Sequence, residues 1–186
     1  MRRKTISSII QVIFLILILG FFLINNSYAA TSEEINVSVD VALKRFVKEV
    51  KGAAEFLDAA KGVLVIPKVI QGGFIIGAEY GEGALRIGGK TVGYYNIAAG
   101  SFGYQIGAQQ KDIMLVFMNK DALEKFRASK GWQAGVDGTV AMINIGAEGS
   151  IDSRKIKEPI VGFVFGQKGL MAGVSIKGAK FTKLKK

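Results

Sequence analysis

Carboxylates are the side chains of this chain that could catalyse a reaction as a pair. The sequence contains no Cys and no His, which excludes a thiolate nucleophile, a zinc site with the usual nitrogen and sulfur ligands, and a Ser-His-Asp triad. Two acidic side chains that converge in a cleft could still hydrolyse a glycoside. The candidates are Glu79, Asp112, Asp137 and Glu148. Nothing in their spacing brings two of them together, so we expect most of them to be solvated or hydrogen-bonded.

Two short motifs have a superficial likeness to catalytic loops. Gly88-Gly89-Lys90-Thr91 resembles the end of a phosphate-binding loop, but Ala84 stands where that motif requires its first glycine. Ser101 lies between glycines, as in a nucleophile elbow, but the chain has no histidine to act as its base. We therefore predict a protein that is not an enzyme and that uses no metal and no cofactor.

Basic side chains indicate a different chemistry, the binding of anions. The formal net charge is +10, and in an exported protein this favours lipid head groups or cell-envelope polymers over nucleic acid. The candidate lipid-binding residues are Lys44, Arg45, Lys48 and Lys51 in a predicted helix, and Lys180, Lys183, Lys185 and Lys186 near the C-terminus. The alternatives are an ordinary solvated helix face for the first group and, for the second, an edge strand whose lysines prevent aggregation.

The N-terminal residues have the pattern of a secretory signal peptide. Arg2, Arg3 and Lys4 precede an apolar stretch over 9–24, and the small residues Ser27 and Ala29 fit a cleavage site. We expect a signal peptide over 1–29, cleavage before Ala30, and export to the periplasm or cell envelope. The alternative is an uncleaved anchor, because the apolar stretch is close to the length that spans a bilayer.

The elements that must position the basic residues begin with a helix. Residues 30–37 are polar and predict a short tether, and from Ser38 apolar residues recur at three- and four-residue steps. Ser38 is the expected N-cap and Gly62 the expected C-terminal stop, with a kink or break possible at Gly52. The apolar stripe consists of Val39, Leu43, Phe46, Val47, Val50, Ala54, Leu57 and Ala60.

Short apolar runs separated by glycines predict a curved sheet after this helix. Repeated glycine within strands is typical of bulges, bends and close backbone approach. Gly88-Gly89 is a hairpin signal, and Asn119 is expected to cap a short helix through Leu123 and Phe126, ended by Gly131. The strands are expected at 63–66, 73–80, 82–87, 91–98, 101–108, 113–118, 133–136, 140–149, 160–165 and 170–176. The fold class is therefore α+β: a single domain with a curved or barrel-like antiparallel sheet, an N-terminal amphipathic helix and a short second helix.

An ordered set of motifs runs through the predicted helix and sheet. The set comprises the amphipathic helix, Lys61-Gly62-Val63-Leu64-Val65-Ile66-Pro67, Gly72-Gly73-Phe74, Gly81-Glu82-Gly83-Ala84, Gly100-Ser101-Phe102-Gly103-Tyr104-Gln105-Ile106-Gly107, and Asp112 before a hydrophobic strand. In this order it resembles the SYLF-domain family, the lipid-binding domain of certain eukaryotic SH3-containing actin regulators. The likeness places such a domain over 38–186. Tyr94-Tyr95-Asn96-Ile97 departs from the family, which often has a Trp-Ser-x-Pro-like stretch there.

The resemblance implies binding to membranes that contain acidic lipids, and actin binding in some members. Because this chain has the pattern of an exported member, actin is not expected as its partner. The first hypothesis is thus an exported, non-enzymatic protein that binds anionic phospholipids or a membrane surface. The alternatives are a cell-envelope structural or assembly protein with a protein or polymer partner, and a hydrolase with a carboxylate pair.

Overall fold

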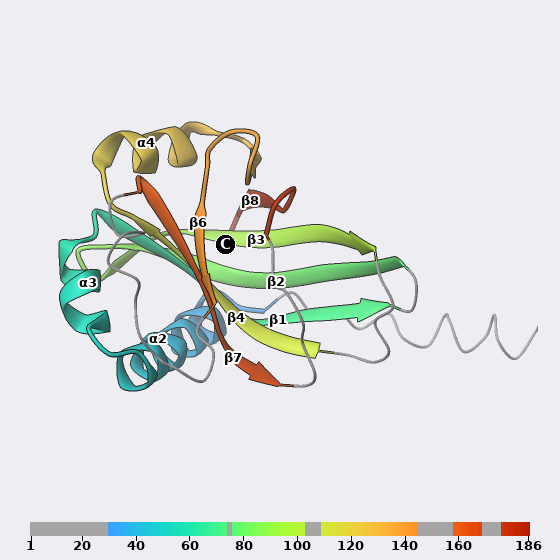
Figure 1. Ribbon diagram of the computed structural model, residues 1–186, viewed down its shortest axis with the longest axis horizontal. Helices are drawn as coiled ribbons and strands as arrows, with labels where there is room; N and C mark the ends of the chain where they lie inside the picture. The colour runs from blue at the N-terminus through green and yellow to red at the C-terminus, as the bar shows by residue number, and fades with distance from the viewer. Residues whose placement is uncertain (1–29, 74–75, 103–108, 145–157, 169–175) are drawn as a thin grey trace, which may run out of the picture. The chain divides into compact units, whose positions relative to one another are not determined.

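The computed structural model describes residues 30–73, 76–102, 109–144, 158–168 and 176–186 (Figure 1). The chain divides into two compact units, Met1–Ala30 and Thr31–Lys186. The first unit lies almost wholly outside the described residues, and with it the predicted signal peptide. The predicted strand at 170–176 and the carboxylate of Glu148 also fall outside them, apart from Ile176.

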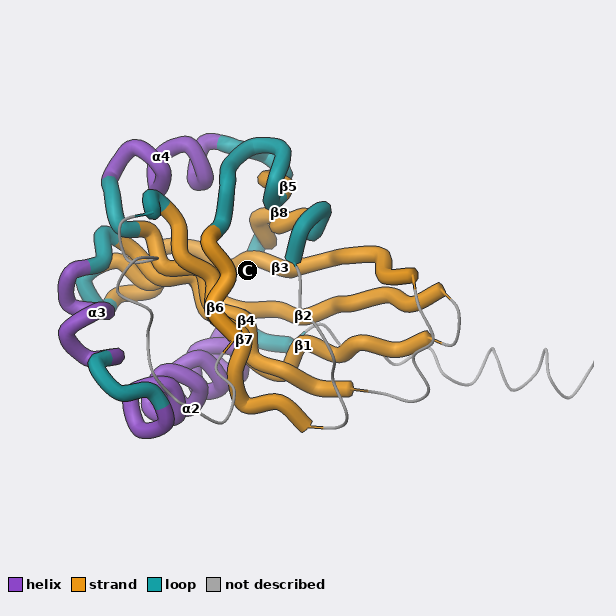
Figure 2. The backbone as a smooth tube through the Cα atoms, viewed as in Figure 1, coloured by secondary structure: helices purple, strands orange, loops and turns teal. Residues whose placement is uncertain are grey.

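In its described residues, the second unit is built on one curled sheet of eight strands (Figure 2). Its order is β5-β8-β3-β2-β1-β4-β7-β6. Neighbouring strands are antiparallel except β6 and β7, which run parallel, so the sheet is mixed. The strands are β1 (Gly62–Gly73), β2 (Ile76–Ile87), β3 (Lys90–Phe102), β4 (Gln109–Phe117), β5 (Trp132–Gln133), β6 (Ala141–Asn144), β7 (Ile160–Lys168) and β8 (Lys180–Leu184). The predicted α+β class with a single curved sheet is confirmed.

The central strands are longer than the sequence predicts. β1 does not end at Pro67 but continues through a register shift between Ile66 and Val69, where Lys68 has a φ of 53°. β2 and β3 each join two predicted strands into one. The glycines within β2 serve close packing rather than termination, since a Cβ at Gly83 would collide with the carbonyl oxygen of Val65. The predicted hairpin at Gly88-Gly89 is confirmed, with both residues at positive φ.

The described residues include three helices beside the sheet, and the first of these begins earlier than expected. α2 spans Ser32–Glu49, so the residues predicted as a tether are mostly helical. Its N-cap is Thr31 rather than Ser38, and a capping box links Thr31 to Glu34. The helix breaks at Gly52, which has a φ of 80°, and α3 follows over Ala53–Ala59. The predicted stop at Gly62 is wrong, because Gly62 is already the first residue of β1.

The two faces of the sheet carry different helices (Figure 1). α4 (Lys120–Ala128), capped by Asn119 as predicted, buries Leu123 and Phe126 in the main core. Phe126 lies at the centre of an aromatic group, with ring centroids 5.0 Å from Tyr95, 4.9 Å from Phe117 and 5.5 Å from Trp132. Because side chains alternate along a strand, the opposite face of β7 presents Phe163 and Phe165 to Phe46 of α2, at centroid distances of 4.9 and 5.1 Å.

Among the helices that the structure describes, none has the length and apolar character needed to cross a bilayer.

Candidate functional site

The solvent-facing side of α2 combines apolar and basic side chains. Val37, Val41, Lys44 and Lys48 are spaced by four, three and four residues, which places them in one line along a helix. Val37 is 59% exposed and Val41 51%, and beside them Val47 is 44% exposed. Lys44 and Lys48 are exposed as well. We call Val37, Val41, Lys44, Val47 and Lys48 the outer ridge of α2.

The outer ridge is directed outward because the opposite side of α2 is held against the sheet. Ile35, Val39, Ala42 and Phe46 are buried at the complementary helical spacing, with Val39 and Phe46 fully enclosed. The sequence predicted Val47 as part of this apolar stripe, and the structure places it at the surface instead. Lys51, which follows the helix, is also exposed.

Arg45 differs from the other predicted cations of the helix. Its Nη1 lies 2.6 Å from Oδ2 of Asp112 on β4, and the Arg45 side chain is 34% exposed while that of Asp112 is 2% exposed. The other carboxylate oxygen of Asp112 accepts a hydrogen bond from the backbone N–H of Lys68 at 2.9 Å. The charge of Arg45 is thus engaged by a buried partner within the protein.

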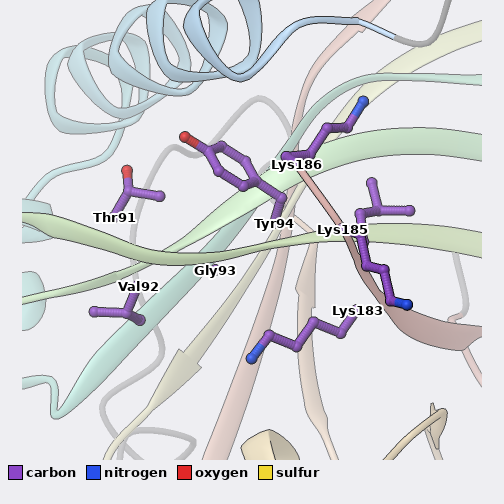
Figure 3. Close-up of a pocket in the computed structure, with 8 residues that line it drawn as sticks. Thr91, Val92, Gly93, Tyr94, Lys183, Lys185 and Lys186 are labelled. Carbon is purple, nitrogen blue, oxygen red and sulfur yellow. The ribbon is translucent and has the colours of Figure 1, made fainter.

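The C-terminal lysines lie beside β3 rather than beside the lysines of α2. Lys183, Leu184, Lys185 and Lys186 line an open groove of about 730 Å³ together with residues 91–94 of β3 (Figure 3). Lys186 Nζ is 2.9 Å from Oε2 of Glu82. Lys180, at the start of β8, is exposed, and its stem covers Gly131. β8 lies between β3 and the two-residue β5, so it is not the edge strand that the lysine pattern suggested.

Asn36 of α2 connects the helix to this groove. It donates to the hydroxyl oxygen of Tyr94 at 2.9 Å and accepts from the hydroxyl of Thr91 at 2.7 Å. In Figure 3 the two hydroxyl groups point to the same side, toward the helix. Asn36 and Lys48 are separated by roughly 18 Å along the axis of α2, at 1.5 Å per residue. The C-terminal lysines therefore lie near the N-terminal part of α2, whereas Lys48 and Lys51 lie at its C-terminal end.

The candidate carboxylates of the hydrolase alternative are held by different partners. Glu79 pairs with Lys111 at 2.8 Å, Asp112 pairs with Arg45, and Asp137 accepts from the backbone N–H of Gln133 at 2.6 Å. These three described carboxylates therefore do not form the convergent pair that glycoside hydrolysis requires. Within the described ranges, no cluster of three acidic residues is placed to hold a metal ion.

The C-terminal part of the chain matches a known protein family. Residues 98–186 fit the family model Ysc84, whose description is "Las17-binding protein actin regulator". The resemblance to the SYLF-domain family is thereby confirmed, because the Ysc84 domain is the SYLF domain. No curated protein sequence matches the chain.

The Ysc84 match covers only part of the candidate site. It includes Asp112, α4 and β8 with the C-terminal lysines, whereas α2 and its outer ridge precede it. Sequence reasoning found the exposed lysines of α2 but missed Val37, Val41 and the role of Asp112. The four-residue step from Val37 to Val41, continued by Lys44 and Lys48, is the signal that would have shown the ridge.

Proposed function

We propose that this protein binds the surface of anionic lipid membranes and that the outer ridge of α2 is the contact. The observation that carries the proposal is that half-exposed valines are followed by exposed lysines along one helical line. A surface-bound helix places its apolar side chains at the acyl boundary while its lysines reach the anionic head groups.

A useful binding free energy requires both the lysines and the valines of α2. Lys44, Lys48 and Lys51 near an anionic surface contribute about 3 kcal/mol together, which is less than the roughly 4 kcal/mol of a millimolar complex. Each half-exposed valine adds on the order of 1 kcal/mol when it is buried in the membrane. Insertion of three valines brings the affinity between the millimolar and the micromolar range.

The groove at the C-terminal lysines supplies a second anionic contact in this proposal. Lys183 and Lys185 are exposed there, close to the start of α2. Lys180 and Lys186 belong to the same basic region, although Lys186 also pairs with Glu82. Because this groove and the lysines of α2 are far apart along the helix, contact with both would orient the protein on a membrane surface.

The proposal includes export and excludes catalysis as the main role. The signal-peptide pattern over 1–29 supports export to the periplasm or cell envelope, and the Ysc84 description names binding rather than a reaction. Native mass spectrometry of protein from its own cells tests this part. A measured mass equal to that of residues 30–186 supports cleavage and export. A mass equal to that of residues 1–186 contradicts cleavage.

Co-sedimentation with vesicles tests the membrane contact. We expect the protein to pellet with vesicles containing phosphatidylglycerol and to pellet poorly with neutral phosphatidylcholine. Lys44→Glu with Lys48→Glu should weaken binding at least about thirtyfold, because two lost cations are worth about 2 kcal/mol. Val37→Ser with Val41→Ser should weaken it while leaving the charge unchanged.

The matched control is the double variant Lys120→Glu and Lys125→Glu. It changes the charge by the same amount on exposed residues of α4, on the other face of the sheet. An equal loss of vesicle binding in the two double variants would show that net charge alone explains the effect. It would contradict the outer ridge as the contact. Pelleting that is indifferent to anionic lipid would reject the proposal in favour of a protein or polymer partner, which the Ysc84 description supports as the alternative.

A further inference from the structure

Asp112 is a buried carboxylate whose two oxygens hold two separate parts of the chain. Oδ2 receives Arg45 of α2, and Oδ1 receives the backbone N–H of Lys68, the residue of β1 with positive φ. Gly166 of β7 closes the site, since a Cβ there would come within 2.8 Å of Oδ2 of Asp112 and 2.7 Å of Nη1 of Arg45. One side chain of β4 thus joins α2, β1 and β7.

α2 forms a second ion pair with the sheet, and the carboxylate of that pair is more exposed than Asp112. Asp40 and Arg86 also connect α2 to the sheet, at 2.7 Å. The Arg86 side chain is 15% exposed, but its carboxylate partner Asp40 is 58% exposed. An ion pair whose carboxylate is exposed is weakened by solvent and salt, whereas the buried charge of Asp112 depends on Arg45 and the backbone N–H of Lys68 for its compensation. The Arg45–Asp112 pair is therefore the stronger link between helix and sheet.

We infer that Asp112 and Arg45 are positioning residues, which fix the C-terminal half of α2 on the sheet so that Lys44, Val47 and Lys48 face outward. Arg45 follows Lys44 directly, so the orientation of one constrains the other. Arg45 then acts through Asp112 and is not itself a head-group contact. This inference rests on the proposed membrane contact, which it makes more specific.

The two roles of Arg45 predict effects of opposite sign. If Arg45 contacted lipid, removal of the Asp112 charge would free it and would strengthen binding to anionic vesicles. If the pair positions α2, the same change loosens the helix and weakens binding. Asp112→Asn is the suitable variant, because the amide retains one acceptor but can no longer serve both Arg45 and Lys68.

The matched control is Asp40→Asn, which removes one negative charge from the same helix region. We expect Asp112→Asn to weaken binding to phosphatidylglycerol vesicles about tenfold, the effect of losing one charge-assisted hydrogen bond. Asp40→Asn should leave binding within about twofold of the original protein, as expected for a carboxylate that is exposed to solvent. Amide hydrogen exchange over α2 should accelerate in Asp112→Asn and stay close to the original rate in Asp40→Asn.

A second variant keeps the test decisive if Asp112→Asn does not fold. Arg45→Lys keeps the charge but loses the planar geometry that fits a carboxylate. It should weaken binding if Arg45 positions the helix and should bind normally if Arg45 meets lipid as a charge. Tighter binding by Asp112→Asn than by Asp40→Asn, or unchanged exchange over α2, would overturn the inference.

Failure of the proposed function gives a different result. If the original protein binds no vesicles at all, the membrane contact is rejected, yet the exchange experiment still reports whether Asp112 holds α2 in place.

Discussion

At the scale of single residues, Lys111 and Glu79 form the most enclosed ion pair that the structure describes. Lys111 is 2% exposed, Glu79 is 7% exposed, and Nζ lies 2.8 Å from Oε1. Gln71 on the neighbouring strand places its Oε1 3.5 Å from the same nitrogen. Such a pair contributes little net stability, but each partner depends on the other, because a lone buried charge is very costly.

Lys111→Met should therefore lower the free energy of unfolding by about 3 kcal/mol or more. Chemical denaturation of the purified protein measures this change. The double variant Lys111→Met with Glu79→Leu should recover most of the loss, since apolar residues of similar volume can replace a buried pair at little cost. A loss below about 1 kcal/mol for the single variant would contradict a desolvated pair, because pairs in solvent are worth that little.

Tyr80, the residue after Glu79 in β2, is half exposed, and its surroundings in the sheet shift its pKa. Burial, followed by its hydrogen bond to Glu82, raises the pKa of Tyr80 above the usual tyrosine value. The hydroxyl donates to Oε1 of Glu82 at 2.8 Å, while Oε2 of Glu82 receives Lys186. Tyr80 therefore remains a neutral hydrogen-bond donor at physiological pH.

At the scale of elements, the break between α2 and α3 depends on one backbone conformation. Gly52 has a φ of 80°, and a Cβ there would meet nothing within 4 Å. Gly52→Ala should thus cost about 1 kcal/mol of stability through backbone strain alone, as measured by thermal unfolding. Gly100→Ala is the control, because that site is equally open but has no positive φ. Equal effects of the two variants would contradict the backbone explanation.

The same elements show what sequence reasoning can and cannot predict. The apolar spacing of α2 predicted the helix and its buried Val39 and Phe46, because local periodicity determines which face of a helix is buried. Its start was misplaced, although the Thr31–Glu34 capping-box signature was present in the sequence. The longer strands were missed because glycine marks both turns and close packing, and only the partner strand, as at Gly83 against Val65, distinguishes the two.

The candidate site likewise combines features that the sequence predicted with contacts that it could not predict. Exposure of Lys44 and Lys48 follows from helical spacing and was predictable. The pairing of Arg45 with Asp112 joins residues that are 67 positions apart, and no local pattern predicts such a contact. The parallel pairing of β6 with β7 is likewise a property of the whole topology rather than of either strand.

At the scale of the whole molecule, β8 completes the sheet from a distant part of the sequence. Phe181 is 1% exposed, pairs with Ile97 of β3, and lies 5.8 Å from the ring of Trp132. Phe181→Ala should lower the free energy of unfolding by about 3 to 5 kcal/mol, the usual cost of removing a buried aromatic ring. Lys185→Ala, an exposed change close by, should stay within about 0.5 kcal/mol. A small effect of Phe181→Ala in chemical denaturation would show that β8 is dispensable for the core.

The position of β8 also affects when the protein can fold. The contact between Lys186 and Glu82 spans 104 residues, and β3 gains its second neighbour only when β8 arrives. Folding slows as contacting residues become more distant in sequence. We therefore expect the nascent chain to stay incompletely folded until β8 has been synthesised. In the export that we propose, such a delay would leave time for translocation machinery to capture the polypeptide while it is still extended.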